Sequence, residues 1–427
     1  MRLLIKNGRV VDPATQTDET LDILIERGKI VDLKAKIDTE GSKVIDASRL
    51  VVAPGLIDMH THLREPGQEE KETIETGSRA AAKGGFTTIC TMPNTVPPND
   101  NQGVTEFILS EAQKKAVVNV YPIAAITKGL HGAELTDMAD LLEAGAVAFS
   151  DDGQPVLNSL VMRRALEYAQ FLETLIIDHC EDTHLSEGGV MNEGIHSYRL
   201  GLRGIPTSAE EIMVARDIIL AEKSRSRIHF AHVSVKGAVQ LIQEAKRKKI
   251  QVTAEATPHH LLLSDSLLEG YDTNLKVNPP LRSQEDVEAL LSAVKNGTID
   301  VLATDHAPHS PEEKDLEFDR APFGINGLET AVSLLLDRLV NKNIISIHRL
   351  IEMTSTTPAR LLDLKNKGRI AVGADADLTI LNLHKEIVVN VNSFQSKSRN
   401  SPFHNWKLKG APEMTIVGGK IIYPFSS

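Results

Sequence analysis

Apolar residues in the central part of the chain fall into short β-branched runs, and the stretches between the runs have helical spacing. Such spacing predicts helices at Lys71–Lys83, Asp137–Glu143 and Ser208–Lys223. Ser208 and Glu211 have the spacing of a capping box at the start of the last helix. The eight runs that we predict as strands are Val51–Met59, Thr87–Thr91, Val117–Ile126, Ala146–Ser150, Thr174–Ile177, Arg227–Ala231, Val252–Ala256 and Asp300–Ala303.

The alternation of these strands and helices indicates βα units and a parallel sheet. Eight such units favour an α/β fold of the (β/α)₈ TIM-barrel type over a doubly wound open sheet. An open sheet often has a glycine-rich turn after its first strand, and neither G-x-G-x-x-G nor G-x-x-x-x-G-K-[ST] occurs here. The sequence therefore gives no support for a nucleotide-binding turn.

Both ends of the chain have a different pattern, with short alternating strands and turn dipeptides. Asn7-Gly8 and Gly418-Gly419 each lie between alternating apolar residues, which is typical of hairpins. We therefore expect a small β-sandwich domain formed by both termini, residues 1–53 and 370–427. The barrel, residues 54–369, would be inserted between them.

Two polar stretches are predicted to lie in loops. Asn392–Phe403 has the composition of a surface loop. The highly charged Ser310–Arg320 follows the last predicted barrel strand and would lie near the mouth of the barrel. It is either a solvated loop or a mobile lid over a substrate.

The composition of the 427 residues, 41% hydrophobic and 25% charged, is ordinary for a soluble globular protein. A net charge of −11 makes a nucleic-acid or acidic-membrane binder an unfavourable interpretation. No apolar run approaches the length of a membrane span. The two cysteines, Cys90 and Cys180, exclude a disulfide framework and fit a cytoplasmic location.

Histidines and aspartates follow several of the predicted strands. His60 and His62 come after the first strand as His-x-His, a spacing that places both side chains on the same side. In a barrel, the carboxyl ends of all strands meet at one mouth. Nitrogen and oxygen ligands without thiolates suit Zn²⁺, with Mn²⁺ or Co²⁺ as possible substitutes. The other residues with this placement are Asp151, Asp152, His179, His232 and Asp305, with His259 and His260 as outer neighbours at best. The sequence does not show which side chains of this strand point to the mouth, so either Asp151 or Asp152 could be the one that does.

The residues around these positions resemble a known family. Pro54–His62 is similar to the opening of the amidohydrolase superfamily, and its extension Leu63–Gly67 is similar to the dihydroorotases. The resemblance extends from about residue 3 to 424 and is greatest for single-function bacterial enzymes. The further blocks that carry it are Met92–Thr95, Ser150–Gly153, Asp178–Asp182, Ala231–Ser234, Pro258–Leu261, Val277–Arg282 and Ala321–Gly324.

This resemblance implies a cyclic amidohydrolase with two Zn²⁺ ions per chain. Asp152 would bridge the ions, at a place that a carbamylated lysine takes in many relatives. The remaining implied ligands are His60, His62 and Asp305 for the more buried ion, and His179 and His232 for the second. The implied substrate contacts are His62, Leu63, Arg64, Asn94, Asn278, His309, Phe323 and Gly324.

The implied reaction is the reversible cyclisation of N-carbamoyl-L-aspartate to (S)-dihydroorotate plus water, in de novo pyrimidine (UMP) biosynthesis. Zinc lowers the pKa of a bound water from 15.7 to roughly 7, which makes a nucleophile available at neutral pH. Asp305 would be the catalytic general base and acid. A guanidinium at the mouth, that of Arg64, can bind a carboxylate with two hydrogen bonds. Alternatively, Arg64 forms a structural salt bridge with Glu65.

Other functions remain open at this stage. A hydantoinase, dihydropyrimidinase or allantoinase would share the barrel and the metals but need not bind a carboxylate. A non-catalytic scaffold for aspartate transcarbamoylase would tend to lose metal ligands, and all of the implied ligands are present here. We expect a small-molecule substrate, with a homodimer and a transcarbamoylase as possible partners, and neither nucleic acid nor membrane.

Overall fold

Eight parallel strands form a closed barrel in the computed structural model, which describes residues 2–425. Three strands pair in one sheet and five in another. Bridges between Ala124 and Phe149 and between Thr61 and His306 join the two sheets at both ends. The predicted TIM barrel is therefore confirmed. Its strands are β6 (Leu56–Thr61), β7 (Phe86–Thr91), β8 (Asn119–Pro122), β9 (Phe149–Ser150), β10 (Ile176–Asp178), β13 (Ile228–Phe230), β14 (Val252–Ala256) and β15 (Val301–Leu302).

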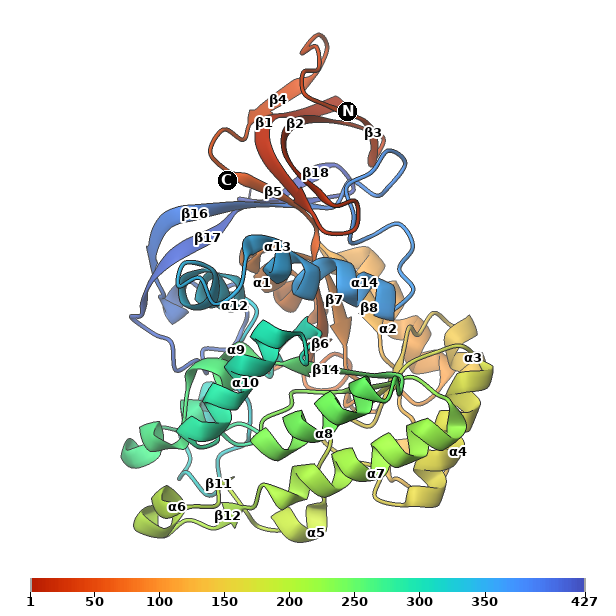
Figure 1. The fold of residues 1–427 in the computed structure, drawn as a ribbon, viewed down its shortest axis with the longest axis vertical. Coiled ribbons are helices and arrows are strands. Elements are labelled where there is room, and N and C mark those ends of the chain that lie inside the picture. Colours follow the sequence, from red (N-terminus) through yellow and green to blue (C-terminus); the bar gives the residue numbers. More distant parts are fainter. Residues whose placement is uncertain (1, 426–427) are drawn as a thin grey trace.

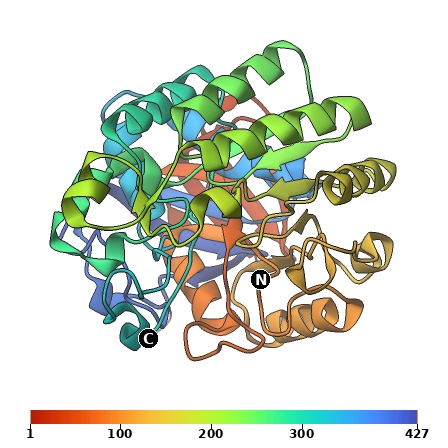
Figure 2. The same ribbon diagram turned by 90° about the horizontal axis from the view of Figure 1, so that it is seen from below.

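Helices surround the barrel, as the view from the side opposite the terminal strands shows (Figure 2). Local signals set their ends: the Thr73 side chain caps the first helix, and Gly85, at φ 93°, ends it. The helices between strands are α1 (Ile74–Gly84), α2 (Gln102–Lys115), α3 (Met138–Glu143), α4 (Ser159–Phe171), α7 (Ser208–Ser224), α8 (Lys236–Arg247) and α10 (Gln284–Asn296). Those after the last strand include α12 (Ala331–Leu335), α13 (Ile347–Ile351) and α14 (Thr357–Leu361).

The capping box predicted at Ser208 is wrong. Thr207 is the N-cap of α7, and its side chain makes no capping hydrogen bond. The Glu210 carboxylate in the first turn instead accepts hydrogen bonds from the backbone N–H groups of Ser234 and Val235, at 2.9 and 3.3 Å. The first turn of α7 thus carries an acidic residue that binds the neighbouring βα loop.

The single strand predicted at Val51–Met59 is two strands that belong to different sheets. β5 (Val51–Pro54) pairs with the terminal strands, whereas β6 starts the barrel at Leu56. Gly55 separates the two strands. A Cβ atom there would lie 2.1 Å from Thr87 Oγ1, so no larger residue fits at this crossing without rearrangement.

The strands from both ends of the chain form one continuous sheet, which lies above the barrel in Figure 1. It has a core of its own, which includes Ile23, Val52 and Ile380. Gly418-Gly419 forms the predicted turn, but Asn7-Gly8 forms a bulge within one strand instead of a hairpin. The domain boundaries at residues 53/54 and 369/370 stay predictions. Besides β5, the strands are β1 (Arg2–Asp12), β2 (Thr17–Glu26), β3 (Lys29–Lys34), β4 (Lys43–Asp46), β16 (Leu378–Val388), β17 (Lys407–Val417) and β18 (Lys420–Tyr423).

The two polar stretches differ in exposure, since the first has several buried side chains and most of the second is exposed. In the stretch Asn392–Phe403, the side chains of Ser396, Ser398 and Asn400 are buried. In the charged segment after β15, helix α11 (Pro311–Lys314) ends at a buried lysine. The prediction of a simple surface loop is therefore wrong for the first stretch. No helix in residues 2–425 is both long and apolar enough to cross a membrane.

Candidate active site

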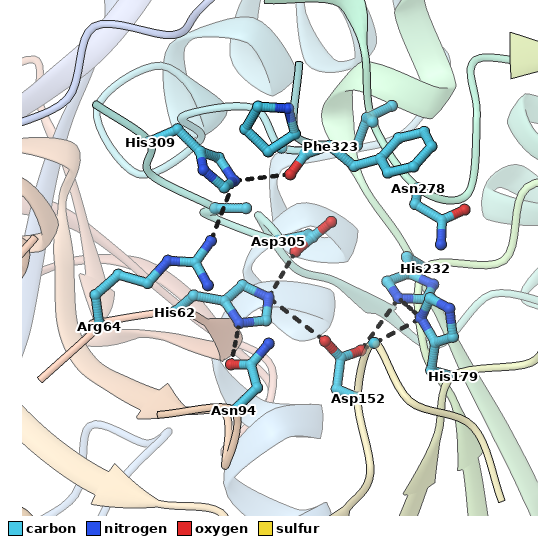
Figure 3. Close-up of a pocket in the computed structure, with 15 residues that line it drawn as sticks. His62, Arg64, Asn94, Asp152, His179, His232, Asn278, Asp305, His309 and Phe323 are labelled. Atoms are coloured by element: carbon cyan, nitrogen blue, oxygen red, sulfur yellow. Dashed lines mark hydrogen bonds and ion pairs between the residues drawn. The ribbon is translucent and has the colours of Figure 1, made fainter. Parts of the chain in front are cut away.

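Four histidines and two aspartates at the carboxyl ends of barrel strands meet at the mouth of the barrel. Figure 3 shows all of them except His60, which lies at the end of β6. Asp152 lies at the centre, with its carboxylate 3.3 Å from His232 Nε2 and 3.4 Å from His60 Nε2. His62 Nε2 lies 3.1 Å from Asp305 Oδ1, and His179 Nδ1 lies 3.6 Å from Asp152 Oδ1. The structure thus brings together all six residues that the sequence suggested as metal ligands.

Asp151 points away from this cluster. Its carboxylate accepts hydrogen bonds from the backbone N–H groups of Ile126 and Thr127, at 2.7 and 3.0 Å. It therefore anchors the loop that follows β8. The choice that the sequence left open is resolved by this placement: Asp152 faces the four histidines.

Outer hydrogen bonds orient the rings of three of the four histidines, His60, His62 and His179. His60 Nδ1 lies 2.6 Å from Glu255 Oε1, and His179 Nε2 lies 2.9 Å from Glu181 Oε2. His62 Nδ1 lies 2.8 Å from Asn94 Oδ1. Because each of these oxygens is an acceptor, the proton lies on the outer nitrogen. In the neutral form of each of these rings, the inner nitrogen would have a lone pair for a metal, which is the arrangement of metal-binding histidines.

The cluster keeps its carboxylates ionised. Burial alone would raise the pKa of Asp305, but the neighbouring His60 and His62 outweigh it and lower the pKa. Burial would likewise lower the pKa of His60, and the carboxylates around it, led by Asp152, reverse this and raise the pKa. Negative charge is therefore concentrated on oxygens that a cation can bind.

The residues fit a bound metal. His60 Nε2 is buried and has no hydrogen-bond partner among the described residues, although it points at the Asp152 and Asp305 carboxylates. Two sets of three side chains bring potential ligand atoms within 4.8 Å of one another: His60, His62 and Asp305, and His60, Asp152 and His232. The donors are imidazole nitrogens and carboxylate oxygens, which suit zinc.

A cavity of about 310 Å³ opens beside the cluster. Arg64 lies on its wall, where its Nε donates to Pro308 O at 3.2 Å and its Nη2 lies 3.4 Å from His309 Nε2. Among the described residues, no carboxylate forms an ion pair with Arg64. The alternative salt bridge with Glu65 is wrong, because Glu65 accepts from the Ile74 N–H and from Lys115.

The far wall of the cavity is backbone. The carbonyl of Phe323 lies 2.8 Å from His309 Nε2, and Gly324 adopts φ 149°. A Cβ atom at Gly324 would lie 2.6 Å from Ala307 O, so only glycine fits here without rearrangement. Asn278 also lines the cavity and donates to Glu181 at 2.8 Å.

The predicted substrate contacts line this cavity with one exception. Leu63 has a fully buried side chain that packs in the core against Gly77 and does not reach the cavity. His259 and His260 are buried in α9 (Pro258–Leu262) and supply no atom to either candidate metal group.

Two carboxylates around the cluster were missed from the sequence. Glu255 is fully buried within β14 and binds His60, while Glu181 connects His179 to Asn278. A glutamate between alanines in a buried parallel strand is a detectable signal, since such a charge needs a partner. Glu181 carries no comparable signal, because a loop glutamate is ordinarily solvated.

Comparisons with known proteins identify the class first. Residues 248–423 match the family model described as Amidohydrolase family. Among solved structures, L-hydantoinase (dihydropyrimidinase) from Arthrobacter aurescens is 28% identical with a TM-score of 0.89, covering 98% of this chain and 95% of its own. Dihydropyrimidinase from Brevibacillus agri is 26% identical with a TM-score of 0.85, covering 99% and 95%. The fold and site thus define a cyclic amidohydrolase.

The family within this class follows from closer relatives. Residues 48–238 match the model described as Dihydro-orotase-like. The dihydroorotase of Pelotomaculum thermopropionicum is 55% identical, covering 99% of this chain and 98% of its own. That of Syntrophus aciditrophicus is 50% identical, covering 99% of both chains. The chain belongs to the dihydroorotase family.

Proposed function

We propose that this chain is a dihydroorotase that interconverts N-carbamoyl-L-aspartate and (S)-dihydroorotate plus water, in the synthesis of pyrimidines. The observation that carries the proposal is Arg64. Its guanidinium lines the cavity beside His309 and has no carboxylate partner among the described residues. A buried guanidinium that forms no ion pair within the protein can bind an anion with two hydrogen bonds, and both substrates carry a carboxylate.

The reacting bond would lie over the histidine–carboxylate cluster. One zinc ion would be held by His60, His62 and Asp305, and the second by His179 and His232. Asp152 would bind both ions. Mn²⁺ or Co²⁺ could substitute for zinc. Two such ions would lower the pKa of water and polarise the amide carbonyl. The outer hydrogen bonds of His60, His62 and His179, which leave their inner nitrogens facing the two aspartates, support this assignment.

The remaining residues of the site would orient the substrate and transfer a proton. Arg64, Asn94 and His309 would bind the substrate carboxylate, and Asn278 with the Phe323-Gly324 backbone would bind the ring amides. Asp305 lies between the cluster and the cavity. It would accept the proton of the attacking water and deliver it to the ring nitrogen as the C–N bond breaks.

Replacement of the cationic side chain tests the proposal. Arg64→Met removes a charge that would make two charge-assisted hydrogen bonds, which together contribute roughly 3–5 kcal/mol. We expect kcat/KM for dihydroorotate to fall roughly 10²- to 10⁴-fold with no change in metal content. Arg163→Met, at an exposed arginine of α4, is the matched control and should be silent. Equal activity of Arg64→Met and the control would refute the assignment.

A neutral-ring amidase is the second candidate, because the solved structures named above carry those activities. Such an enzyme would hydrolyse hydantoin or dihydrouracil and would tolerate Arg64→Met. Comparison of the three substrates with both variants therefore separates the two functions.

The assembly and the location stay predictions. We propose a homodimer, with aspartate transcarbamoylase as a possible partner, in the cytoplasm. Light scattering of the isolated chain, and of its mixture with a transcarbamoylase, would measure both associations.

A further inference from the structure

A buried segment from the C-terminal part of the chain lies behind the substrate cavity. Residues Ser396–Asn400, here called the 396–400 segment, belong to the connection between β16 and β17. The side chains of Ser396, Ser398 and Asn400 are between 1% and 3% exposed. Because buried polar side chains are retained where their hydrogen bonds are satisfied, their partners indicate what the segment does.

Both the nitrogen and the oxygen of the Asn400 side-chain amide form hydrogen bonds with backbone groups of the segments that line the cavity. Its Nδ2 donates to Ala307 O at 3.0 Å and to Gly324 O at 2.9 Å. Its Oδ1 accepts from the backbone N–H of His309 at 3.3 Å. The backbone N–H of Asn326 also donates to Asn400 O, at 2.8 Å. One side chain thus connects the segment after β15 to the segment that carries Phe323 and Gly324.

Its neighbour Ser398 strengthens the same connection. Ser398 Oγ lies 2.6 Å from His309 O and 3.1 Å from His309 N. The Asn326 side chain donates to Ser398 O at 2.8 Å. Neither Asn400 nor Ser398 lines the active-site cavity, so neither reaches the substrate itself.

We propose that Asn400 is a positioning residue that holds His309 and the Phe323-Gly324 backbone at the spacing needed to bind substrate. This inference rests on the proposed function, in which both groups contact the substrate. Beyond β15, a parallel bridge between His306 and Ile325 and the hydrogen bond from the Ala307 N–H to Ile325 O, at 3.0 Å, already join the two segments. Among the described residues, His309 itself takes part in no such bridge, and its backbone N–H donates only to the side chains of Ser398 and Asn400. The amide of Asn400 therefore extends the connection of the two segments to His309, from a part of the chain that is distant in sequence.

The nearly isosteric Asn400→Asp tests the role. The substitution replaces the Nδ2 amide group, which donates to two carbonyls, with a carboxylate oxygen that repels both carbonyl oxygens. It does not change any of the proposed metal ligands. We expect KM for both substrates to rise roughly 10- to 100-fold, while kcat changes less than about 3-fold and metal content is unchanged. The control is Asn341→Asp, at an exposed amide that also donates to a backbone carbonyl, Lys409 O.

A second variant covers the case in which Asn400→Asp does not fold. Ser398→Ala removes a single hydroxyl and should raise KM in the same direction, by about 3-fold or more. If every folded variant keeps the wild-type KM, or loses kcat or metal without a change in KM, the positioning role is refuted.

Amide hydrogen exchange separates this inference from the proposed function. Peptides that cover residues 305–326 should exchange faster in Asn400→Asp than in wild type, with the rest of the barrel unchanged. A wild-type chain without dihydroorotate turnover would refute the function, and faster exchange would still support the coupling of the two walls. Unchanged exchange would overturn the coupling whatever the activity.

Discussion

Glu255 is predicted to control metal affinity from behind the cluster. Its Oε1 accepts from His60 Nδ1 at 2.6 Å and from the His232 N–H at 3.2 Å, and its Oε2 lies 3.2 Å from His229 Nε2. Burial alone would raise the pKa of Glu255, but His60 and His229 outweigh it and lower the pKa. An ionised carboxylate therefore fixes the His60 ring and makes its inner nitrogen more basic.

Glu255→Gln removes this charge with little change in volume. One of the two acceptor oxygens becomes an amide donor, so either His60 or His229 loses its partner. Loss of such an outer carboxylate lowers metal affinity roughly 10- to 100-fold, which corresponds to about 1.4–2.7 kcal/mol.

Chelator competition measures the affinity directly, with metal content as a second readout. The matched control is Glu244→Gln on α8, where the carboxylate is exposed and lies 3.6 Å or more from its basic neighbours. Equal zinc affinity of Glu255→Gln and the control would refute the inference that outer carboxylates prepare the histidines for metal.

Two further predictions concern the walls of the site. Gly324→Ala places a Cβ atom 2.6 Å from Ala307 O, so kcat/KM should fall roughly 10-fold or more at unchanged metal content; wild-type kinetics would show that the wall is not rigid. Glu72 binds His306 and the 396–400 segment, and these contacts lower its pKa despite burial. Because the folded-state pKa is the lower one, Glu72 stabilises the fold above pH 4.5, and this contribution is lost as the pH falls through the folded-state value. The difference between wild type and Glu72→Gln in urea midpoint should therefore shrink from pH 6 to pH 3, and a constant difference would contradict the assignment.

Much of the fold could be predicted because the barrel repeats one simple pattern. Each βα unit combines a short β-branched run with a helix, and the barrel places the residues after each strand at one mouth. His60, His62, His179, His232 and Asp305 could therefore be grouped before any coordinates were known. Sheet membership was harder to predict, as the division of one apolar run at Gly55 shows.

The supporting residues are less visible in a sequence because their roles depend on contacts that are distant along the chain. Asn400 lies in a polar stretch, and polarity alone predicts solvent exposure. Its burial follows from partners more than 70 residues away, such as Gly324. Asn7-Gly8 shows a related limit, since the dipeptide favours a left-handed backbone and the neighbouring strands decide between hairpin and bulge.

The central claim is that this barrel holds metal and acts on dihydroorotate. Its most direct test is the loss of dihydroorotate absorbance by zinc-loaded protein, with metal content measured on the same sample and Asp305→Ala as the control. We predict about two metal ions per chain and turnover that disappears in Asp305→Ala. Metal-loaded protein that hydrolyses hydantoin or dihydrouracil but leaves dihydroorotate intact would contradict the account.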